Sequence, residues 1–294
     1  MLRQAERKEL AMEAFKKAVH IRSHSLRVAI NAPICIYDAA EKLGVRVVFK
    51  EDKTVEGIYR KGNPPNIIVS SLRPTGRQAF TCAHELGHHV FGHGDVWGEV
   101  LTWGSNDPDE FLVDCFAGYL MMPPSVVNQA LTVRGWNVSR LSPVEAFVLA
   151  GIMGVGYTTL LNHMSLALNN SLSYQRAELL QKTEPKQIRK EIIGEDVSED
   201  VVVIDEHWPS EYRSIDVKVG DYIVLPHGTV TEGGVADHVD SIARGEIYRG
   251  VRPGTGRFMN SRFDWAAFIR VTRRNYTGFA RYRHLEDEEF LDEE

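Results

Sequence analysis

The pattern of hydrophobic and polar positions predicts a small sheet followed by a long helix in the first part of the chain. We expect helices over residues 3–20 and 34–43, and β-branched strands over residues 45–49, 57–60 and 66–70. A longer helix should follow from about residue 73 to Phe91, with Thr75 as its cap and with Gly92 and Gly94 at its end. The segment 3–20 is amphipathic and charged, as expected for a surface helix that packs across the domain behind it.

Helical spacing continues after a loop rich in Gly and Trp. Asp107 has the side chain of an N-cap, and Pro108 suits the first helical position. This helix should end at the pair Pro123 and Pro124, and helical tendency persists from Ser125 to about residue 193.

The pattern changes again after about residue 196. Short β-prone runs, separated by Gly, Pro, Asp and Asn, occupy residues 201–204, 217–219, 222–225, 246–248, 257–259, 268–271 and 279–282. We therefore expect a β-rich C-terminal domain.

Composition narrows the class of protein. The net charge is -6, but the segment 286–294 holds seven acidic residues and no basic ones, so the remainder is nearly neutral. This tail should be solvated and mobile. Three cysteines favour a reducing compartment, and neither a signal peptide nor an apolar run of the ~20 residues that a membrane span requires is present. We expect a cytoplasmic protein that does not enter the membrane.

The long helix carries the pattern H-E-x-x-H. His84 and His88 lie one helical turn apart on one face, so both imidazoles can reach one zinc ion (Zn2+), and Glu85 can hold a water on it. Zinc lowers the pKa of such a water towards ~7, and Glu85 would then act as the general base. The alternative is a pair of surface histidines on an amphipathic helix.

Zinc peptidases with this motif fall into classes that differ in the residue that supplies the third protein ligand of the zinc. The metzincin class requires Gly and His where this chain has Phe91 and Gly94, which excludes that class in its usual form. Glu110 and Asp114 lie four residues apart on the following helix. We predict that Glu110 is the third ligand and that Asp114 orients the first His; direct ligation by Asp114 is the alternative.

For the other histidines and the cysteines near the motif we predict structural roles and no part in metal binding. His89 and His93 are also four apart, but we expect them to point away from the motif face, and we expect Cys82 and Cys115 to pack in the core. The strand 66–70 is predicted to form the edge of the cleft, where an extended peptide could add as a further strand.

Residues 149–163 are similar to a helix-turn-helix, with Gly in the turn and apolar anchors on both sides. Base contacts would fall around Tyr157, Thr158, Asn162 and His163, where few Lys or Arg residues supply phosphate contacts. We therefore favour a helical pair that packs on the core or recognises protein; direct nucleic-acid binding is the less favoured interpretation.

Two stretches resemble one family, the ImmA/IrrE metallopeptidases of bacteria and their phages. Residues 77–88 are similar to that family's "RQRFTLAHELGH" and residues 116–123 to its "FAAxLLMP". The resemblance covers roughly residues 30–170. It implies a cytoplasmic zinc peptidase that cleaves a helix-turn-helix repressor, with His84 and His88 as ligands, Glu85 as base and Glu110 as third ligand.

The chain also departs from this family. Leu112, Val113 and Asp114 stand where the family usually has Glu-Ala-Asn, which removes one candidate carboxylate and favours Glu110. The C-terminal part does not match the GAF-like sensor domain that some relatives carry.

These observations together predict an α+β fold. Its parts are a zincin-like metallopeptidase domain with an N-terminal helix over residues 1–124, a helical helix-turn-helix-like segment over 125–195, a β-rich domain over 196–285 and an acidic tail over 286–294. The predicted function is zinc-dependent cleavage of a repressor, which relieves repression of mobile-element or stress-response genes. The alternative is a DNA-binding or protein-interaction regulator with a non-catalytic metal site; the oligomeric state is left open.

Overall fold

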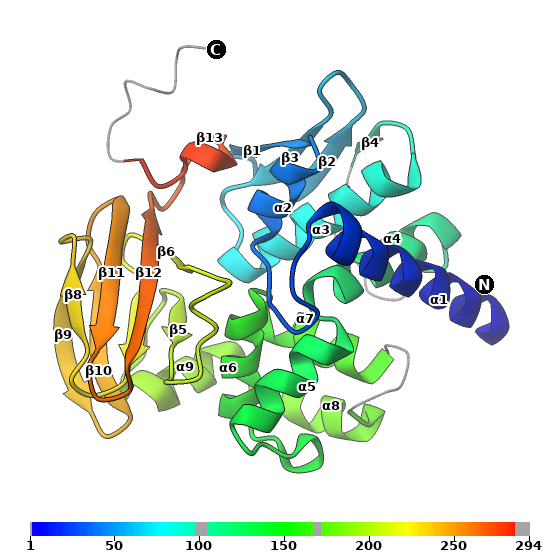
Figure 1. Ribbon diagram of the computed structural model, residues 1–294. Coiled ribbons are helices and arrows are strands. Elements are labelled where there is room, and N and C mark those ends of the chain that lie inside the picture. Colours follow the sequence, from blue (N-terminus) through cyan, green and yellow to red (C-terminus); the bar gives the residue numbers. More distant parts are fainter. Residues whose placement is uncertain (1, 98–104, 167–171, 286–294) are drawn as a thin grey trace.

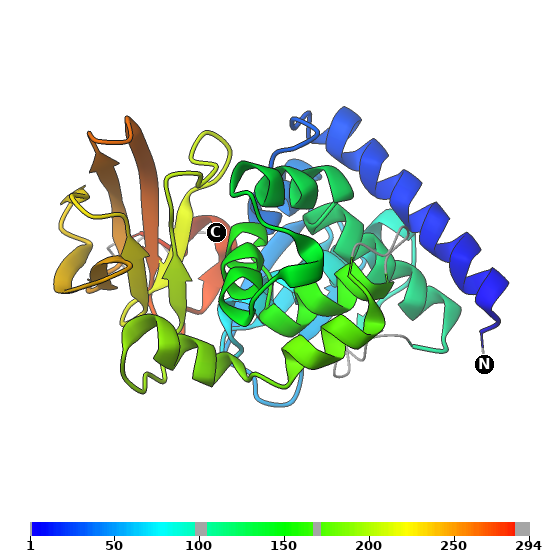
Figure 2. The same cartoon turned by 90° about the horizontal axis from the view of Figure 1, so that it is seen from below.

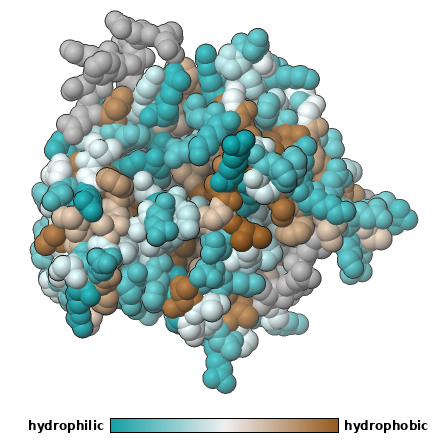
Figure 3. Space-filling model, in the orientation of Figure 1, coloured by the Kyte–Doolittle hydropathy of each residue, from teal (hydrophilic) through white to brown (hydrophobic). Residues whose placement is uncertain are grey.

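The computed structural model describes residues 2–97, 105–166 and 172–285, so the acidic tail 286–294 lies outside the described residues. Within these ranges the fold is mixed α+β, as predicted. Strands near the N-terminus form a sheet with helices packed on it, the middle of the chain is helical, and the C-terminal strands form a separate lobe (Figure 1). Hydrophobic residues are scattered among hydrophilic ones over the face shown in Figure 3.

The N-terminal helix α1 (Gln4–His20) packs along α4 (Pro108–Met121), at the end of the molecule opposite the β-rich lobe (Figure 2). Its contact face is narrow because the buried side chains are alanines: Ala11, Ala14 and Ala18. A π-helical turn (Ile21–Ser25) follows, and the buried guanidinium of Arg22 in it donates to the Leu120 carbonyl at 2.8 Å. The predicted packing of the N-terminal helix is therefore confirmed.

The first sheet has the strand order β13-β1-β3-β2-β4 in the described residues. Helix α2 (Ile36–Lys42) leads into β1 (Arg46–Lys50), which is followed by β2 (Gly57–Arg60) and β3 (Asn66–Ser70). Strand β4 (Val96–Trp97) pairs with β2. The prediction that residues 66–70 form an edge strand is wrong, because β1 pairs in parallel with one side of β3 and β2 pairs with the other. A peptide can therefore add only at an outer strand of this sheet.

Helix α3 (Thr75–Phe91) carries the H-E-x-x-H pattern. Its N-cap is Pro74, and the Thr75 hydroxyl makes no capping bond, so the prediction that Thr75 caps the helix is wrong. Two glycines let neighbouring elements approach it. A Cβ on Gly57 of β2 would lie 2.4 Å from Thr81 Cγ2, and a Cβ on Gly87 would lie 2.9 Å from Val113 Cβ of α4. The sheet and α4 therefore both press closely on α3.

Helix α4 begins as predicted. The Asp107 side chain accepts from the backbone N–H groups of Asp109 at 2.9 Å and of Glu110 at 3.2 Å, and Pro108 is the first helical residue. The helix ends at Met121, just before the two prolines, and α5 (Pro124–Val133) starts at the second of them. This cap places the Glu110 side chain one turn into the helix.

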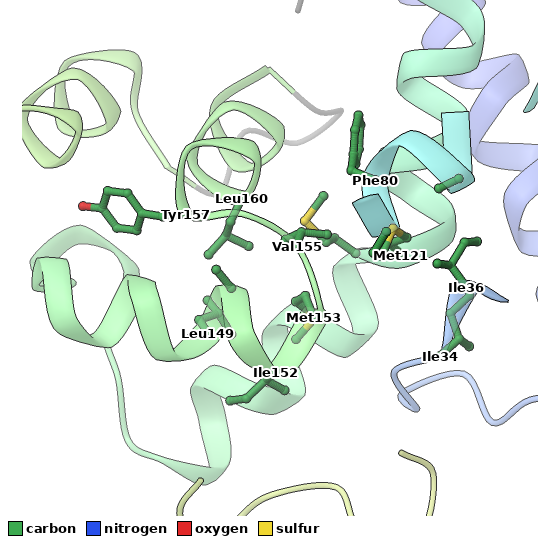
Figure 4. Close-up of a cluster of buried hydrophobic side chains, with 14 of the residues drawn as sticks. Ile34, Ile36, Phe80, Met121, Leu149, Ile152, Met153, Val155, Tyr157 and Leu160 are labelled. Carbon is green, nitrogen blue, oxygen red and sulfur yellow. The ribbon is translucent and has the colours of Figure 1, made fainter. Parts of the chain in front are cut away.

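The middle of the chain is helical as predicted, with α6 (Pro143–Met153), α7 (Tyr157–Leu166), α8 (Tyr174–Gln181) and α9 (Pro185–Ile193) following α5. Helices α6 and α7 cross at 93° around Gly154, whose φ is 71°. In Figure 4 the buried side chains of Leu149 and Leu160 face one another between α6 and α7, and Val155 lies on the side of Met121 of α4. In the described ranges no single helix has the length and apolarity to cross a membrane, and only α6 and α7 together, as a bent pair, meet that test.

Two of the four residues expected to contact bases are buried. The Tyr157 hydroxyl donates to the Leu180 carbonyl at 2.9 Å, and His163 Nε2 bonds to the Met122 carbonyl at 3.0 Å. Half of the expected base-reading face of α7 is thus packed inside the protein.

The C-terminal lobe consists, in the described residues, of two four-stranded sheets with the orders β5-β7-β10-β9 and β6-β12-β11-β8. Their bounds are Val201–Val203, Tyr222–Leu225, Gly245–Gly250 and Ala236–Ile242 in the first, and Ile215–Lys218, Trp265–Thr272, Gly254–Asn260 and Val230–Glu232 in the second. The predicted β-rich region is confirmed. Strands β8 and β9 were not predicted, because most of their residues are exposed and show no alternation of apolar and polar positions.

The end of the described chain returns to the first sheet. The predicted strand 279–282 is only partly a strand: β13 (Gly278–Phe279) pairs with β1, and residues Ala280–Tyr282 form a 3-10 helix. Behind this pairing, Arg270 Nε lies 2.6 Å from Asp216 Oδ1 and Arg270 Nη1 lies 3.2 Å from Asp38 Oδ2. The β-rich lobe is therefore attached to the N-terminal part by the pairing of β13 with β1 and by the ion pair of Arg270 with Asp38 of α2.

Buried His163 should make stability depend on pH. Burial lowers the pKa of His163 to about 4, although its bond to the Met122 carbonyl acts in the opposite direction. Because the folded pKa lies below the ordinary value of ~6.5, the unfolded chain takes up this proton first. Stability from this residue should be complete above pH ~6.5 and fall by up to about 3 kcal/mol as pH decreases through ~4. Urea unfolding of the wild type and of His163→Gln between pH 4 and 7 measures this; equal pH slopes for both proteins would contradict it.

Candidate metal centre

Three predicted ligands meet where α3 crosses α4. His84 and His88 come from one face of α3, and Glu110 comes from the first turn of α4. His84 Nε2 lies 3.2 Å from His88 Nε2, and the Glu110 carboxylate lies 3.2 Å from His84 Nε2 and 3.6 Å from His88 Nε2. One ligand atom from each residue falls within 4.8 Å of the others. Two imidazoles and one carboxylate converging in this way fit the donor set of a catalytic zinc site.

Asp114 lies behind His84 and does not face the cluster. Its Oδ1 is 2.8 Å from His84 Nδ1, which is the ring nitrogen opposite to the one that faces Glu110. With Nδ1–H donated to this buried carboxylate, Nε2 is left directed towards His88 and Glu110. A carboxylate in this position fixes the orientation of a metal-binding imidazole.

His93 contacts His88, the second histidine of the motif. The prediction that His93 points away from the motif face is therefore wrong. Its Nδ1 lies 2.8 Å from His88 Nδ1. The prediction assumed helical spacing between His89 and His93, but the helix ends at Phe91 and Gly92 adopts the left-handed conformation. The chain therefore turns back, and the backbone N–H of His93 donates to the His88 carbonyl at 3.0 Å. His89 instead bonds to the Tyr59 hydroxyl at 3.0 Å.

Glu85 is a buried carboxylate without a hydrogen bond in the described part of the chain. Its side chain is 0% exposed, and neither oxygen has a partner. It extends towards β2, where a Cβ on Gly57 would lie 2.7 Å from Glu85 Oε1. Burial raises the pKa of Glu85 to about 7, against the opposing effect of His84. A carboxyl group with this pKa can both accept and release a proton near neutral pH.

The electrostatics of the cluster suit a cation. Burial alone would lower the pKa of His84, but hydrogen bonds to Asp114 and Glu110 outweigh burial and raise it to about 10. Burial and the charge on His84 lower the pKa of His88 to about 4. The hydrogen bond with His84 also lowers the pKa of Glu110. The two carboxylates therefore stabilise one positive charge on the histidine pair, and a bound metal ion would replace that proton.

Residues 40–144 match the family model of the IrrE N-terminal-like domain, a peptidase family. This part of the chain is thus similar to the IrrE N-terminal-like domain. This finding confirms the predicted resemblance, and the matched region includes α3, α4 and every residue of the cluster described above. A search of curated proteins found no match to the chain. The match suggests a metallopeptidase type for the domain at residues 40–144.

The remaining residues that the sequence indicated lie outside the cluster of the IrrE N-terminal-like domain. Cys82 is fully buried and Cys115 is partly buried against the core, which agrees with the packing role expected for both. His93 is the residue that the sequence prediction missed. Its signal was present in Gly92, because a glycine that ends a helix in the left-handed conformation commonly reverses the chain over the last turn.

Removing Glu110 and removing Asp114 should affect zinc differently. Glu110→Ala should abolish stoichiometric zinc retention, because it removes a donor atom from the cluster. Asp114→Ala should weaken zinc binding by about 10- to 100-fold while zinc still saturates the site, because only the orientation of His84 is lost. Competition with a chromophoric chelator gives both affinities. Glu13→Ala, which removes an exposed carboxylate on α1 outside the cluster, is the control; a larger loss for Asp114→Ala than for Glu110→Ala would reverse the assignment.

His93→Ala should also weaken zinc binding by about tenfold or more, because it removes the partner of His88 Nδ1. His89→Ala is the matched control, since His89 bonds to Tyr59 and not to the cluster. The same chelator competition measures both variants. Equal zinc affinities for the two variants would show that the contact between His93 and His88 does not support the site.

Proposed function

We propose that this protein is a zinc-dependent endopeptidase of the ImmA/IrrE type that cleaves a helix-turn-helix transcriptional repressor and so relieves repression of mobile-element or stress-response genes. The observation that carries the proposal is the cluster of His84, His88 and Glu110 beside the unpartnered carboxylate of Glu85, within an IrrE N-terminal-like domain.

In this proposal His84, His88 and Glu110 hold the zinc, while Asp114 and His93 hold the two imidazole rings in position. When bound, zinc would lower the pKa of a water towards ~7 and polarise the carbonyl of the scissile bond. Three protein ligands leave a position open for water, whereas a structural site would need a fourth. No fourth donor joins the cluster among the described residues.

Glu85 is the proposed general base. Its carboxylate would accept the proton of the attacking water and then deliver it to the leaving amine. Burial between α3 and β2 gives the group no competing hydrogen bond in the described residues, so its lone pairs are available for this transfer. The pKa of about 7 suits both directions of the transfer at neutral pH.

The proposed substrate rests on the family resemblance. An extended segment of it would align on the sheet beside α3, and because β3 is paired on both sides, β4 is the strand next to β2 that could receive it. Such pairing uses main-chain groups, so recognition of the repressor would depend mainly on side chains near the cleaved bond.

A regulator with a non-catalytic metal site is the second candidate, and the 93° crossing of α6 and α7 is the observation that favours it. Two facts weigh against it. Tyr157 and His163 of the expected reading face are buried, and a buried general base has no use in a purely structural site.

Glu85→Gln separates the two candidates. Zinc content should stay unchanged, because Glu85 is not a proposed ligand, and cleavage should fall by about 10²- to 10⁴-fold, because the general base is lost. The substrate to test is a purified helix-turn-helix repressor encoded beside the gene of this protein, with cleavage followed on gels and zinc measured by mass spectrometry. Cleavage by Glu85→Gln at the wild-type rate would overturn the peptidase proposal. Repressor binding or DNA binding without cleavage by the wild type would favour the second candidate.

A further inference from the structure

A cavity of about 410 Å³ lies where the three parts of the fold meet. Its walls come from the first turn of α3, the turn between α6 and α7, and the segment of the β-rich lobe from Val201 to Asp216. The volume falls within the range of about 300–1,000 Å³ that is usual for sites of small organic ligands, and such sites often lie between domains. Phe147, Val202 and Trp208 supply apolar surface to it.

Most charged groups on the cavity wall are already paired. Arg77 Nε lies 2.7 Å from a carboxylate oxygen of Glu56, and Asp216 is paired with Arg270 at 2.6 Å. Asp200 Oδ2 accepts from the Thr75 N–H, at the N-terminus of α3, at 3.4 Å. Asp216 is therefore ion-paired, and Asp200 makes a hydrogen bond to the start of α3.

Two guanidinium groups on the wall have no carboxylate partner in the part of the chain that the structure describes: Arg189 of α9 and Arg213 of the β-rich lobe. The Nε atom of each is buried without a hydrogen bond. Arg213 is held in place, because its Nη1 donates to the Ile152 carbonyl at 2.6 Å and its guanidinium lies 5.7 Å from the centre of the Trp208 ring. The wall of the cavity therefore holds two guanidinium groups without a carboxylate in ion-pair contact, and one of them, Arg213, is fixed in position.

Hydrogen-bond donors without acceptors line the same space. The first turn of α7 borders the cavity, and the N–H groups of Tyr157 and Thr158 have no acceptor among the described residues. The N-terminus of a ten-residue helix favours an anion. Tyr37 also lines the cavity; its side chain is only 6% exposed, and its hydroxyl has no partner in the described structure. A buried polar group of this kind requires a partner, and a bound ligand would supply it.

We infer that this cavity binds a small organic anion with a flat apolar body. The anionic group would lie against Arg213, Arg189 and the first turn of α7, and the apolar body against Trp208 and Phe147. The site is separate from the metal cluster and does not depend on the proposed peptidase activity.

The position of the cavity connects such a ligand to the metal helix. Pro74 to Ala79 form part of its wall, and this segment begins the helix that carries His84, Glu85 and His88. A Cβ on Gly76 would lie 2.5 Å from the Val155 carbonyl carbon, so the start of α3 and the turn before α7 are in direct contact. A ligand that joins α7, α3 and the β-rich lobe would stabilise their present arrangement and raise the thermal unfolding temperature.

The fluorescent aromatic sulfonate 1-anilinonaphthalene-8-sulfonate is the probe, used with the zinc-loaded full chain. We expect saturable binding at one site, and protection from hydrogen exchange over residues 75–80 and 157–160. Gly151→Leu should weaken binding by about tenfold or more, because Gly151 lines the cavity and a Cβ there meets nothing within 4 Å, so the new side chain starts in open space. The substitution also removes a glycine from α6, which favours folding.

Arg213→Met and Arg189→Met should each weaken binding about five- to tenfold. Ala5→Leu and Arg140→Met, at exposed positions outside the cavity, are the matched controls and should bind the probe as the wild type does. Glu85→Gln should also bind it normally, so failure of the peptidase proposal would not affect this result. Wild-type binding by Gly151→Leu and by both arginine variants, or protection confined to other segments, would overturn the inference.

Competition then identifies the head group of the ligand. Inorganic phosphate, adenosine 5′-monophosphate and indole-3-acetate are each titrated against the bound probe. Displacement by the nucleotide and phosphate assigns a phosphate head group, and displacement by indole-3-acetate alone assigns a carboxylate. Failure of all three to displace a probe that does bind in the cavity would overturn the assignment of either a phosphate or a carboxylate head group.

Discussion

The close crossing of α3 and α4 is the contact on which the metal cluster depends. Donor atoms from two helices can converge only if the helices approach closely, and Gly87 permits this because a larger residue would meet Val113. The N-cap at Asp107 sets where α4 begins and therefore which residue of its first turn faces His84. All three donors are therefore placed by helices and not by a loop. Asp114, bonded to the far side of His84, fixes the orientation of that ring.

Ionisable side chains lie on both sides of α3 at this crossing. His84 lies between Glu110 and Asp114, and hydrogen bonds to these two carboxylates raise its pKa to about 10 against the effect of burial. Glu85 on the same helix is directed to the other side, towards β2, and burial keeps its proton affinity near neutrality. One helix therefore presents ligands on the side of α4 and a proton-transfer group on the side of the sheet. This arrangement follows from the helical repeat, because residues 84 and 85 are rotated by about 100° from one another.

The β-rich lobe is connected to the N-terminal part of the fold at two places. Strand β13 completes the first sheet beside β1, and Asp216 ties the lobe through Arg270, which also reaches Asp38. Between these attachments and the helices α6 and α7 lies the cavity with Arg189 and Arg213. The lobe therefore contacts the cavity at the start of α3, whereas the metal ligands lie further along the same helix.

The sequence by itself determined what depends on local spacing. The H-E-x-x-H pattern, the cap at Asp107 and the two prolines after α4 predicted the motif helix, its partner and the residues that meet there, because helix periodicity and capping act over a few residues. Only the tertiary structure decided the features that arise from distant contacts. Strand β3 became internal because it lies between β1 and β2, and β13 paired with β1, which lies more than 200 residues earlier in the chain. His93 reached His88 because the helix ended at Phe91, and Arg189 and Arg213 came to line one cavity with α7 only once all three parts of the fold had packed together. Such contacts are set by the shape and charge of whole elements, which no local pattern records.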